Sequence, residues 1–389
     1  MFVPDLRHLS VRRISFAFSV LCALCGQCVS QDFRTIRDGL EYAEVTREFN
    51  GQKVNMNLLR LDLTKVRLDV VHAMDAAIGT ERTSSIATRH GALAAVNGGF
   101  FRLDDSIFAG DPAGALTIDG QRLSESLNNR VVLYISNKGA STSTYIAPLE
   151  TRDEIQIRKW DFIISGINRE RKKDELVLFT PEFNRTTLTD NDGLEIIVRG
   201  DKIAAIRDHS GANVIPADGY ILSATGTFRD KLLLRVKKGS KVFKIVTLVI
   251  SNGGHFLTEE NRKIIDANYA AEDIVAGVPQ LIKNGKVDIT WEQEKTTKTF
   301  VETRHPRTAV AKLKDGKFLM ITVDGRTESS GGISLYDLTD YLLSLGATDA
   351  MNLDGGGSTT MFLGDKVVNH PSDNEGERKV SDALLVSPR

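Results

Sequence analysis

The chain is poor in cysteine, in net charge and in long apolar runs, and each shortage excludes a class of protein. Its 389 residues contain three cysteines, Cys22, Cys25 and Cys28, so the rest of the chain offers no disulfide framework and no thiol nucleophile. The formal net charge is -1, whereas a nucleic-acid-binding protein needs a basic face. No apolar run after the N-terminal segment reaches the roughly 20 residues that a transmembrane helix requires. With 41% hydrophobic residues, the chain can still form a sizeable core.

The first 30 residues have the three-part composition of a secretory signal peptide. Three arginines between positions 7 and 13 precede an apolar stretch over residues 14–24. That stretch is too short to span a bilayer as a helix. Small residues lie just before Gln31, where we expect cleavage. The three cysteines fall inside this apolar segment, so their Cys-x-x-Cys spacing does not indicate a metal or redox motif. The sequence therefore predicts a secreted or periplasmic protein whose catalytic domain covers residues 31–389.

The remaining pattern predicts a mixed fold of strands and helices. Apolar residues alternate over 54–71 and form short runs over 92–96, as in strands, whereas residues 335–345 have helical spacing. Between about 148 and 246, short apolar runs alternate with Asp-Gly and Gly-Asp turns, which predicts a β-rich insertion or subdomain. We also expect a strand over 231–236. The predicted fold class is α/β (α+β), a mixed β-sheet core with flanking helices and this β-rich middle insertion.

A run of three glycines is the strongest local signal in the chain. Gly355, Gly356 and Gly357 follow an apolar segment that ends in Asp354, and Ser358 follows the run. Consecutive glycines are costly in a folded chain because glycine loses the most backbone freedom. A protein retains them where the backbone must approach a ligand closely or adopt angles that side chains forbid. A strand that ends in aspartate and a glycine loop is a common place for a ligand site.

Further polar groups follow other predicted strands. They are Asn97-Gly98-Gly99, the segment 305–308, the segment 324–328 and the segment 369–378. Together they supply guanidinium groups, carboxylates, amides and backbone N–H groups. Arginine presents a planar fork to phosphate oxygens, glycine loops can offer N–H donors to an anion, and cleavage of a glycosidic bond uses a pair of carboxylates. This inventory suits a sugar phosphodiester.

Other chemistries fit the residues less well. The chain has no Gly-Lys-Ser/Thr of a phosphate-binding P-loop, no His-Glu-x-x-His zinc motif and no Gly-x-Ser-x-Gly elbow. No cofactor is therefore expected. Aspartates at 104, 105 and 111, and again at 190 and 192, leave open a structural calcium ion, but solvated loops are the favoured explanation.

Six motifs, in order along the chain, resemble those of the phosphodiester glycosidase family. They are Asn97-Gly98-Gly99-Phe100-Phe101, Gly277-x-Pro279-x-Leu281-Ile282-x-Asn284-Gly285, Arg307-Thr308-Ala309-Val310, Val323-Asp324-Gly325-Arg326-Thr327-Glu328, Asn352-Leu353-Asp354-Gly355-Gly356-Gly357-Ser358 and Pro371-Ser372-Asp373. The resemblance runs from about residue 92 to about residue 386 and is weakest in the β-rich middle. It implies a hydrolase that cleaves the bond between an anomeric carbon and a phosphate, with an N-acetylglucosamine-1-phosphodiester-like substrate. It also implies a role in exopolysaccharide or cell-envelope glycan processing.

The resemblance and the chemistry together give a set of candidate site residues. Asp324 and Asp354 are candidates for base or nucleophile, and Glu328 is a candidate for a second carboxylate. Arg307 and the N–H groups of the triple glycine would hold the phosphate. The candidate substrate-binding residues are Asn97, Gly98, Arg307, Arg326, Asn352, Gly355, Gly356, Gly357, Ser358 and Arg378.

Two functions of other classes remain open at this point. A non-catalytic glycan-binding or cell-wall-binding protein could keep the same fold, because one fold hosts many functions. A metal-dependent phosphodiesterase would cut the P–O bond rather than the C–O bond. The carboxylates at several strand ends favour an enzyme, because a binding protein does not need them.

Overall fold

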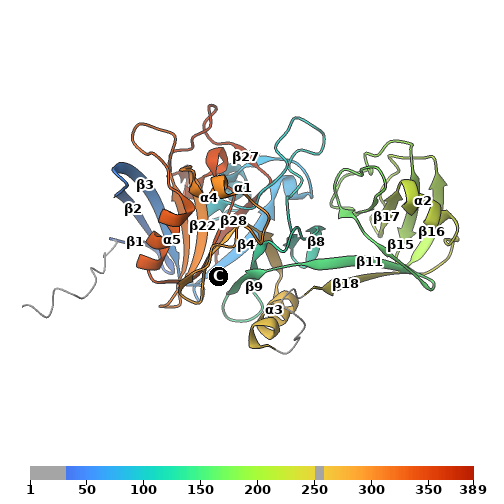
Figure 1. Ribbon diagram of the computed structural model, residues 1–389, viewed down its shortest axis with the longest axis horizontal. Helices are drawn as coiled ribbons and strands as arrows, with labels where there is room; N and C mark the ends of the chain where they lie inside the picture. Colours follow the sequence, from blue (N-terminus) through green and yellow to red (C-terminus); the bar gives the residue numbers. More distant parts are fainter. Residues whose placement is uncertain (1–31, 250–257) are drawn as a thin grey trace, which may run out of the picture. The chain divides into compact units, whose positions relative to one another are not determined.

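The computed structural model describes residues 32–249 and 258–389, so the predicted signal peptide lies outside the described residues (Figure 1). Residues from Phe33 to Arg389 form one compact unit. Its largest sheet has eight strands. Their order is β1 (Arg34–Arg37), β2 (Leu40–Phe49), β3 (Gln52–Leu61), β23 (Phe318–Val323), β22 (Arg307–Leu313), β24 (Ala347–Asn352), β20 (Gln280–Lys283) and β21 (Lys286–Val287).

Helix α5 (Leu335–Ser344) confirms the helical spacing in the sequence and covers one face of this sheet. Leu335, Leu338 and Leu342 are buried against the strands, while the Ser334 hydroxyl accepts a hydrogen bond from the N–H of Asp337 at 3.1 Å and caps the helix. The short helix α4 (Lys298–Glu302) packs beside α5. The other face of the sheet contributes to a separate apolar cluster.

Two further five-stranded sheets complete this part of the fold. One has the order β26 (Lys366–Val367), β25 (Met361–Leu363), β6 (Ala94–Asn97), β28 (Asp382–Pro388) and β4 (Val66–His72), and helix α1 (Thr83–Arg89) contacts β6, β25 and β28. The other has the order β10 (Ser143–Pro148), β9 (Val131–Ser136), β19 (Asp273–Ala276), β7 (Leu116–Ile118) and β8 (Gln121–Ser124), and helix α3 (Glu259–Ala270) contacts β9 and β10. A two-stranded ladder joins β5 (Glu81–Arg82) to β27 (Lys379–Val380). A single turn of 3-10 helix, η1 (Ala73–Asp75), follows β4.

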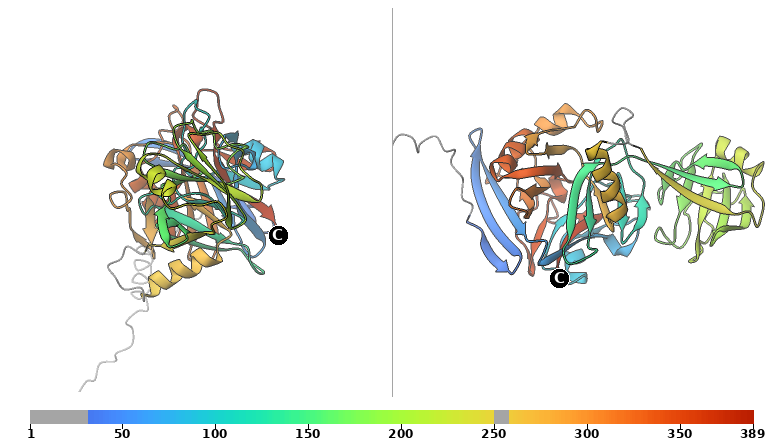
Figure 2. Two further views of the ribbon diagram at one scale, coloured as in Figure 1. Left: turned by 90° about the vertical axis from the view of Figure 1, so that its right-hand side faces the viewer. Right: turned by 90° about the horizontal axis from the view of Figure 1, so that it is seen from below.

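The middle of the chain is β-rich, with its own apolar cluster. Strands β11 (Thr151–Ile157) and β18 (Val242–Leu248) pair along their whole length, as Figure 2 shows, and β12 (Trp160–Ile163) pairs with the other edge of β11. The chain between them forms a sheet of β13 (Gly166–Ile167), β14 (Leu176–Phe179), β17 (Gly219–Ala224), β15 (Leu194–Arg199) and β16 (Lys202–Asp208). That this segment is an independent insertion stays a prediction.

The structure corrects the fold class toward β. Among the paired strands above, only β13 and β14 run parallel, so the α/β arrangement of strands joined by crossover helices is absent from the described residues. Short turns can join only antiparallel neighbours, and such turns are frequent in this sequence. The predicted strand over 231–236 is also wrong, because helix α2 (Gly226–Leu233) occupies its first half. A short apolar run does not distinguish a strand from a helix.

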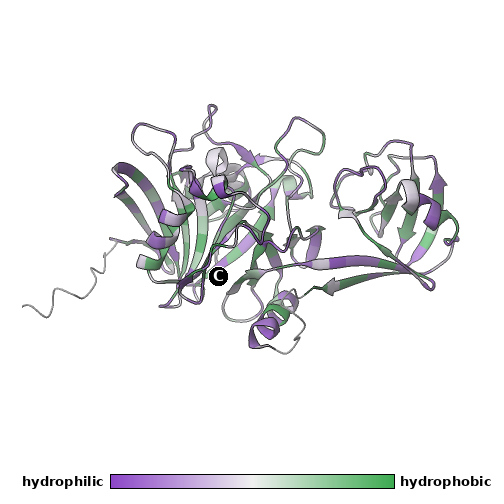
Figure 3. Cartoon of the chain, viewed as in Figure 1, coloured by the Kyte–Doolittle hydropathy of each residue, from purple (hydrophilic) through white to green (hydrophobic). Residues whose placement is uncertain are grey.

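Burial follows the residue pattern of the strands. Figure 3 shows hydrophobic stretches in β22 and hydrophilic residues at the turn between β2 and β3. In β22 nearly every position is buried, whereas the ends of β2 and β3 that meet at Asn50 are exposed. No helix in the described ranges is long and apolar enough to cross a membrane.

Candidate active site

The candidate site forms where three inner strands of the eight-stranded sheet begin or end. Strand β22 lies between β23 and β24 and is antiparallel to both. The start of β22 at Arg307 therefore lies beside the ends of its two neighbours, which continue into Asp324 and Asp354. Strands are spaced by about 4.8 Å, so β23 and β24 are roughly 10 Å apart. The topology thus places a guanidinium-bearing residue between two carboxylate-bearing ones.

The loop 353–360 joins β24 of this sheet to β25 of the second sheet, and Asn97 fixes it. The fully buried Asn97 side chain donates from Nδ2 to the Asp354 carbonyl at 2.8 Å. Its Oδ1 accepts from the Thr308 hydroxyl at 2.7 Å and from the Thr360 N–H at 3.1 Å. Hydrogen bonds within the protein thus occupy both the Nδ2 and the Oδ1 atom of the Asn97 amide. The geometry favours a role for Asn97 in holding the loop, in place of the predicted contact with substrate.

Gly356 has a left-handed backbone angle, φ +61°, which is one of the two reasons for glycine expected from the sequence, whereas N–H groups of the run are engaged within the protein. The N–H of Gly355 donates to Asp354 Oδ1 at 2.9 Å and that of Gly356 donates to the Pro306 carbonyl at 2.8 Å. These two N–H groups are therefore engaged within the protein and do not form the predicted phosphate cradle. The triple glycine must instead serve the close approach of other groups.

Those groups are a backbone carbonyl and two arginine side chains. A methyl group on Gly355 would lie 2.8 Å from the Pro306 carbonyl oxygen, whereas its 3.7 Å separation from Arg307 Cδ is an ordinary contact. A methyl group on Gly356, which has φ +61°, would lie 3.0 Å from Arg326 Nη2, and one on Gly357 would overlap the Arg378 guanidinium. Gly356 and Gly357 thus allow two arginine side chains to lie against the loop, and Arg307 lies beside Gly355.

Arg307 is a buried cation with no acidic partner. The residue is only 2% exposed to solvent. Its Nη2 donates to the carbonyls of Phe300 and Thr303 at 2.7 and 2.8 Å, and its Nε donates to the Ile333 carbonyl at 3.3 Å. Burial, and to a lesser extent the charge of Arg326, lowers the pKa of Arg307 to about 10. It therefore stays charged at neutral pH, and the carbonyls fix its orientation without neutralising it.

The other two arginines differ in their partners. Arg326 is exposed and its Nη2 lies 3.3 Å from His305 Nδ1. Arg378 forms an ion pair with Asp373, with 2.5 Å between Nε and Oδ2. Burial and the nearby charges of Arg307 and Arg326 lower the pKa of His305, which keeps it neutral at pH 7. Within the described residues neither Arg307 nor Arg326 forms an ion pair, so these two guanidinium groups are the ones available to an anion.

The predicted carboxylates lie in different environments. The pKa of Asp354 is raised to about 6 because burial outweighs the opposing effects of the Ser358 hydroxyl, the Gly355 N–H and Arg378; the charge of Asp382 adds a smaller rise. Asp324 is 6% exposed, and its Oδ1 accepts from the His370 N–H at 3.0 Å.

Burial raises the pKa of Asp324 as well. Glu328, by contrast, is exposed in the turn between Thr327 and Ser330. The structure brings Asp324 and Asp354 into the site more firmly than Glu328.

Several buried side-chain oxygens around the loop lack a hydrogen-bond partner among the described residues. They are Asn352 Oδ1, Thr359 Oγ1, Thr360 Oγ1 and Ser372 Oγ, whereas the Ser358 hydroxyl faces the Asp354 carboxylate. The Asn352 amide is oriented by a 2.7 Å hydrogen bond from its Nδ2 to the Val278 carbonyl. Buried polar groups are nearly always paired in proteins, so this cluster suits a hydroxyl-rich ligand. Asn352 and Ser358 were predicted from the sequence, whereas Ser372 was not.

Asp382 is the main residue of the site that the sequence did not single out. It is 1% exposed at the start of β28, and its Oδ1 accepts from the Gly99 N–H at 2.7 Å. In the sequence it reads as the first residue of a final strand. Only the pairing of β28 with β6, which sets Ala383 opposite Asn97, brings it to the glycine loops.

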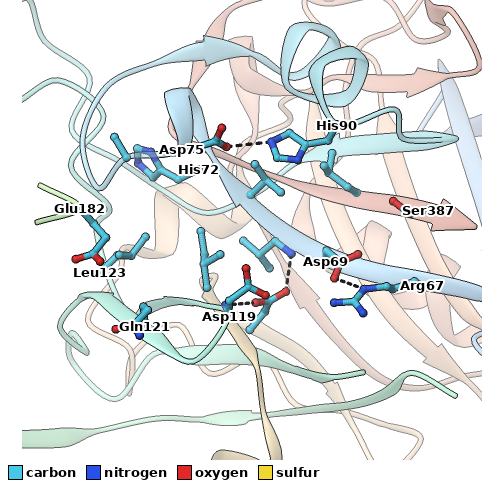
Figure 4. A pocket seen from close by; sticks show the side chains of 16 residues that line it. Arg67, Asp69, His72, Asp75, His90, Asp119, Gln121, Leu123, Glu182 and Ser387 are labelled. Carbon is cyan, nitrogen blue, oxygen red and sulfur yellow. Dashed lines mark hydrogen bonds and ion pairs between the residues drawn. The ribbon is translucent and has the colours of Figure 1, made fainter. Parts of the chain in front are cut away.

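A separate cavity of about 510 Å³ lies between β4, β7, β8 and β28 and is lined by none of the predicted site residues (Figure 4). Its polar side chains are largely paired with one another, as in the 2.7 Å contact of Arg67 with Asp69 and the 3.0 Å contact of His90 with Asp75. In the described ranges no three histidine, cysteine, aspartate or glutamate residues form a metal-binding group. Of the aspartates considered for calcium, Asp104 bonds to Ser106 and Arg102, and Asp190 pairs with Arg171.

Comparison with known proteins places this site in context. The profile of the phosphodiester glycosidase family matches residues 192–387, half of the chain. The bovine N-acetylglucosamine-1-phosphodiester alpha-N-acetylglucosaminidase is 35% identical over 128 residues, which are 31% of this chain and 24% of that protein. The match thus spans about a quarter of this relative.

Two solved structures share the fold. A hypothetical protein from Synechocystis superposes with a TM-score of 0.76 at 20% identity, covering 92% of this chain and 64% of that one. A Burkholderia pseudomallei protein superposes with a TM-score of 0.72 at 23% identity, covering 87% and 74%. On the family match, the protein belongs to the phosphodiester glycosidase family.

Proposed function

We propose that this protein hydrolyses the glycosyl C–O bond of a sugar-1-phosphodiester and releases free sugar and a phosphomonoester. The observation that carries the proposal is the placement of Arg326 and Arg378 against the triple glycine, with Arg307 beside it, next to a carboxylate with a raised pKa. A substrate resembling an N-acetylglucosamine-1-phosphodiester is supported by the name of the bovine relative.

In this reaction the arginines hold the phosphate. Three carbonyl groups hold Nε and Nη2 of Arg307, so its orientation is set before the substrate arrives and Nη1 is left to donate to a phosphate oxygen. Arg326 and Arg378 flank the same loop. The phosphate leaves as a stable anion and needs little protonation, and the arginines stabilise the charge that develops on it.

The remaining task is to stabilise positive charge at the anomeric carbon and to deliver water. Asp354 is the first candidate for base or nucleophile, because a carboxylate with a pKa of about 6 is ionised at neutral pH and still basic enough to accept a proton. Asp324 is the candidate for the second carboxylate. The unpaired oxygens of Asn352 and Thr360 would bind the sugar hydroxyls.

The proposed setting is outside the cytoplasm, in exopolysaccharide or cell-envelope glycan processing. It rests on the signal peptide predicted from the arginines and the apolar run at the N-terminus. Periplasmic or secreted material from the source cells, fractionated and probed with an antibody to the chain, tests this location.

The deciding experiment is hydrolysis of UDP-GlcNAc and GlcNAc-1-phospho-6-mannoside in ¹⁸O-labelled water, with and without a chelator. Label in the released sugar is the expected result and means C–O cleavage. Label in the phosphate, with loss of activity in chelator, would make the protein a metal-dependent phosphodiesterase. Binding of both compounds without turnover would favour a glycan-binding protein. Asp354→Asn, which should lower turnover by orders of magnitude, serves as the inactive control.

A further inference from the structure

The carboxylate of Asp382 is enclosed by the glycine loop that follows β6. The Gly98 N–H donates to the Asp382 carbonyl at 2.9 Å and the Gly99 N–H donates to Asp382 Oδ1 at 2.7 Å. The Ser381 hydroxyl donates to Oδ2. A methyl group on Gly98 would overlap Asp382 Oδ1. The Asp382 carboxylate therefore leaves no room for a side chain at Gly98, and the Ala276 carbonyl, 2.8 Å from a methyl group placed on Gly99, restricts the next position.

The same loop connects Asp382 to Asp354. The peptide group between Gly98 and Gly99 accepts a hydrogen bond at the Gly98 carbonyl from the Asp354 N–H at 3.0 Å, while its N–H, that of Gly99, donates to Asp382 Oδ1 at 2.7 Å. The neighbouring Asn97 amide holds the Asp354 carbonyl. A displacement of Asp382 would thus move the backbone that orients Asp354.

The two carboxylates also interact through their charges. Asp382 is 1% exposed, and none of the ion pairs among the described residues includes it. A buried carboxylate without a basic partner is unfavourable, which suggests a use that offsets the cost. Its negative charge acts on Asp354, together with the opposing charge of Arg378, the Ser358 hydroxyl and the Gly355 N–H.

We propose that Asp382 is a positioning residue, whose enclosed carboxylate orients Asp354 through the peptide group between Gly98 and Gly99 and sets the pH range over which Asp354 is ionised. This rests on the proposed function, in which Asp354 acts as base or nucleophile. A base is most effective when its proton affinity is matched to the working pH. Removing the charge of Asp382 therefore makes Asp354 ionise at lower pH and makes it a weaker base.

The test is Asp382→Asn, which keeps the shape of the side chain. The amide oxygen can still accept from the Gly99 N–H, and the new NH₂ group can donate to Ser381 Oγ. The acid limb of the pH profile of kcat/KM should move down by roughly half to one unit. A shift of one unit from a limb near pH 6 raises the relative activity at pH 5 about fivefold. At the optimum, kcat should fall because the base is weaker, while KM changes little.

Asp273→Asn is the matched control. Asp273 is also a buried carboxylate, 2% exposed, and accepts from the N–H groups of Val70 and Asp119, both at 2.9 Å. It lines the cavity of Figure 4 and not the glycine loop. Its substitution should leave the position of the acid limb unchanged. An equal shift in both variants, or no shift in Asp382→Asn, would overturn the proposal.

A second readout does not depend on activity. The unfolding free energies of the wild type, Asp354→Asn, Asp382→Asn and the double variant are measured by urea denaturation between pH 4 and pH 8. The pH-dependent effect of Asp382→Asn on the unfolding free energy should largely disappear in the Asp354→Asn background, because the carboxyl group that titrates there is absent. If it persists unchanged, the two residues are not coupled and the inference fails. If the coupling is present but no sugar phosphodiester is hydrolysed, the proposed function fails and the link between Asp382 and Asp354 stands.

Discussion

Replacing Asp354 by asparagine should make the protein more stable at neutral pH while it abolishes catalysis. The pKa of this carboxyl is raised from 3.8 to about 6, first by burial and also by the charge of Asp382. Between these two values the folded protein binds more protons than the unfolded chain, so stability falls as the pH rises through this window. Below about pH 4 both states are protonated and the penalty is absent. Above about pH 6 the penalty is complete.

The magnitude follows from the shift. A difference of about 2.2 pKa units corresponds to about 3 kcal/mol at 1.36 kcal/mol per unit. Asparagine retains an oxygen that can accept from the Gly355 N–H and adds an NH₂ group that can donate to Ser358 Oγ. The variant therefore avoids the cost of the buried charge with little loss of packing. The free energy of unfolding of the variant should exceed that of the wild type by up to about 3 kcal/mol at pH 7.5 and by little at pH 4.

The assay is urea unfolding of both proteins at pH 4 and pH 7.5, followed by circular dichroism. Asp340→Asn, which removes an exposed carboxylate from α5, is the control for the loss of one charge. The reasoning would be refuted if the free energies of unfolding of the wild type and Asp354→Asn differed by the same amount at the two pH values. That result would mean that Asp354 is not held in an environment that opposes its ionisation.

Three further substitutions test other parts of the site. Arg307→Lys keeps a charge but loses the fork that binds three carbonyls. We expect the free energy of unfolding in urea to fall by about 2–4 kcal/mol and product inhibition by inorganic phosphate to weaken at least tenfold. Unchanged inhibition would mean that Arg307 does not bind the anion. Gly357→Ala should displace the Arg378 guanidinium and lower kcat/KM roughly tenfold, whereas Gly51→Ala, with φ +76° and nothing within 4 Å, should cost only about 1 kcal/mol of strain and no activity. Glu328→Gln should change kcat by less than about threefold because the side chain is exposed; a loss of orders of magnitude would instead support its predicted catalytic role.

The sequence predicted the local elements whose signals are short-range. The leucine spacing over 335–345 and the glycine at 346 predicted helix α5, and the apolar run over 92–96 predicted β6. The family resemblance also followed from motifs in the sequence and is confirmed by the family match. The fold class was less well predicted, because residue patterns do not show which strands pair or in which direction.

The sequence by itself determined that a triple glycine follows a buried strand, that arginines and aspartates recur after other strands, and that no cysteine chemistry is available beyond residue 28. The tertiary structure decided what these residues do. Antiparallel pairing set Arg307 between the strands that end at Asp324 and Asp354, and the contact of β28 with β6 brought Asp382 against Gly98. These contacts join residues far apart in the chain. Their hydrogen bonds, burial and mutual charges exist only after folding, so no local pattern in the sequence encodes them.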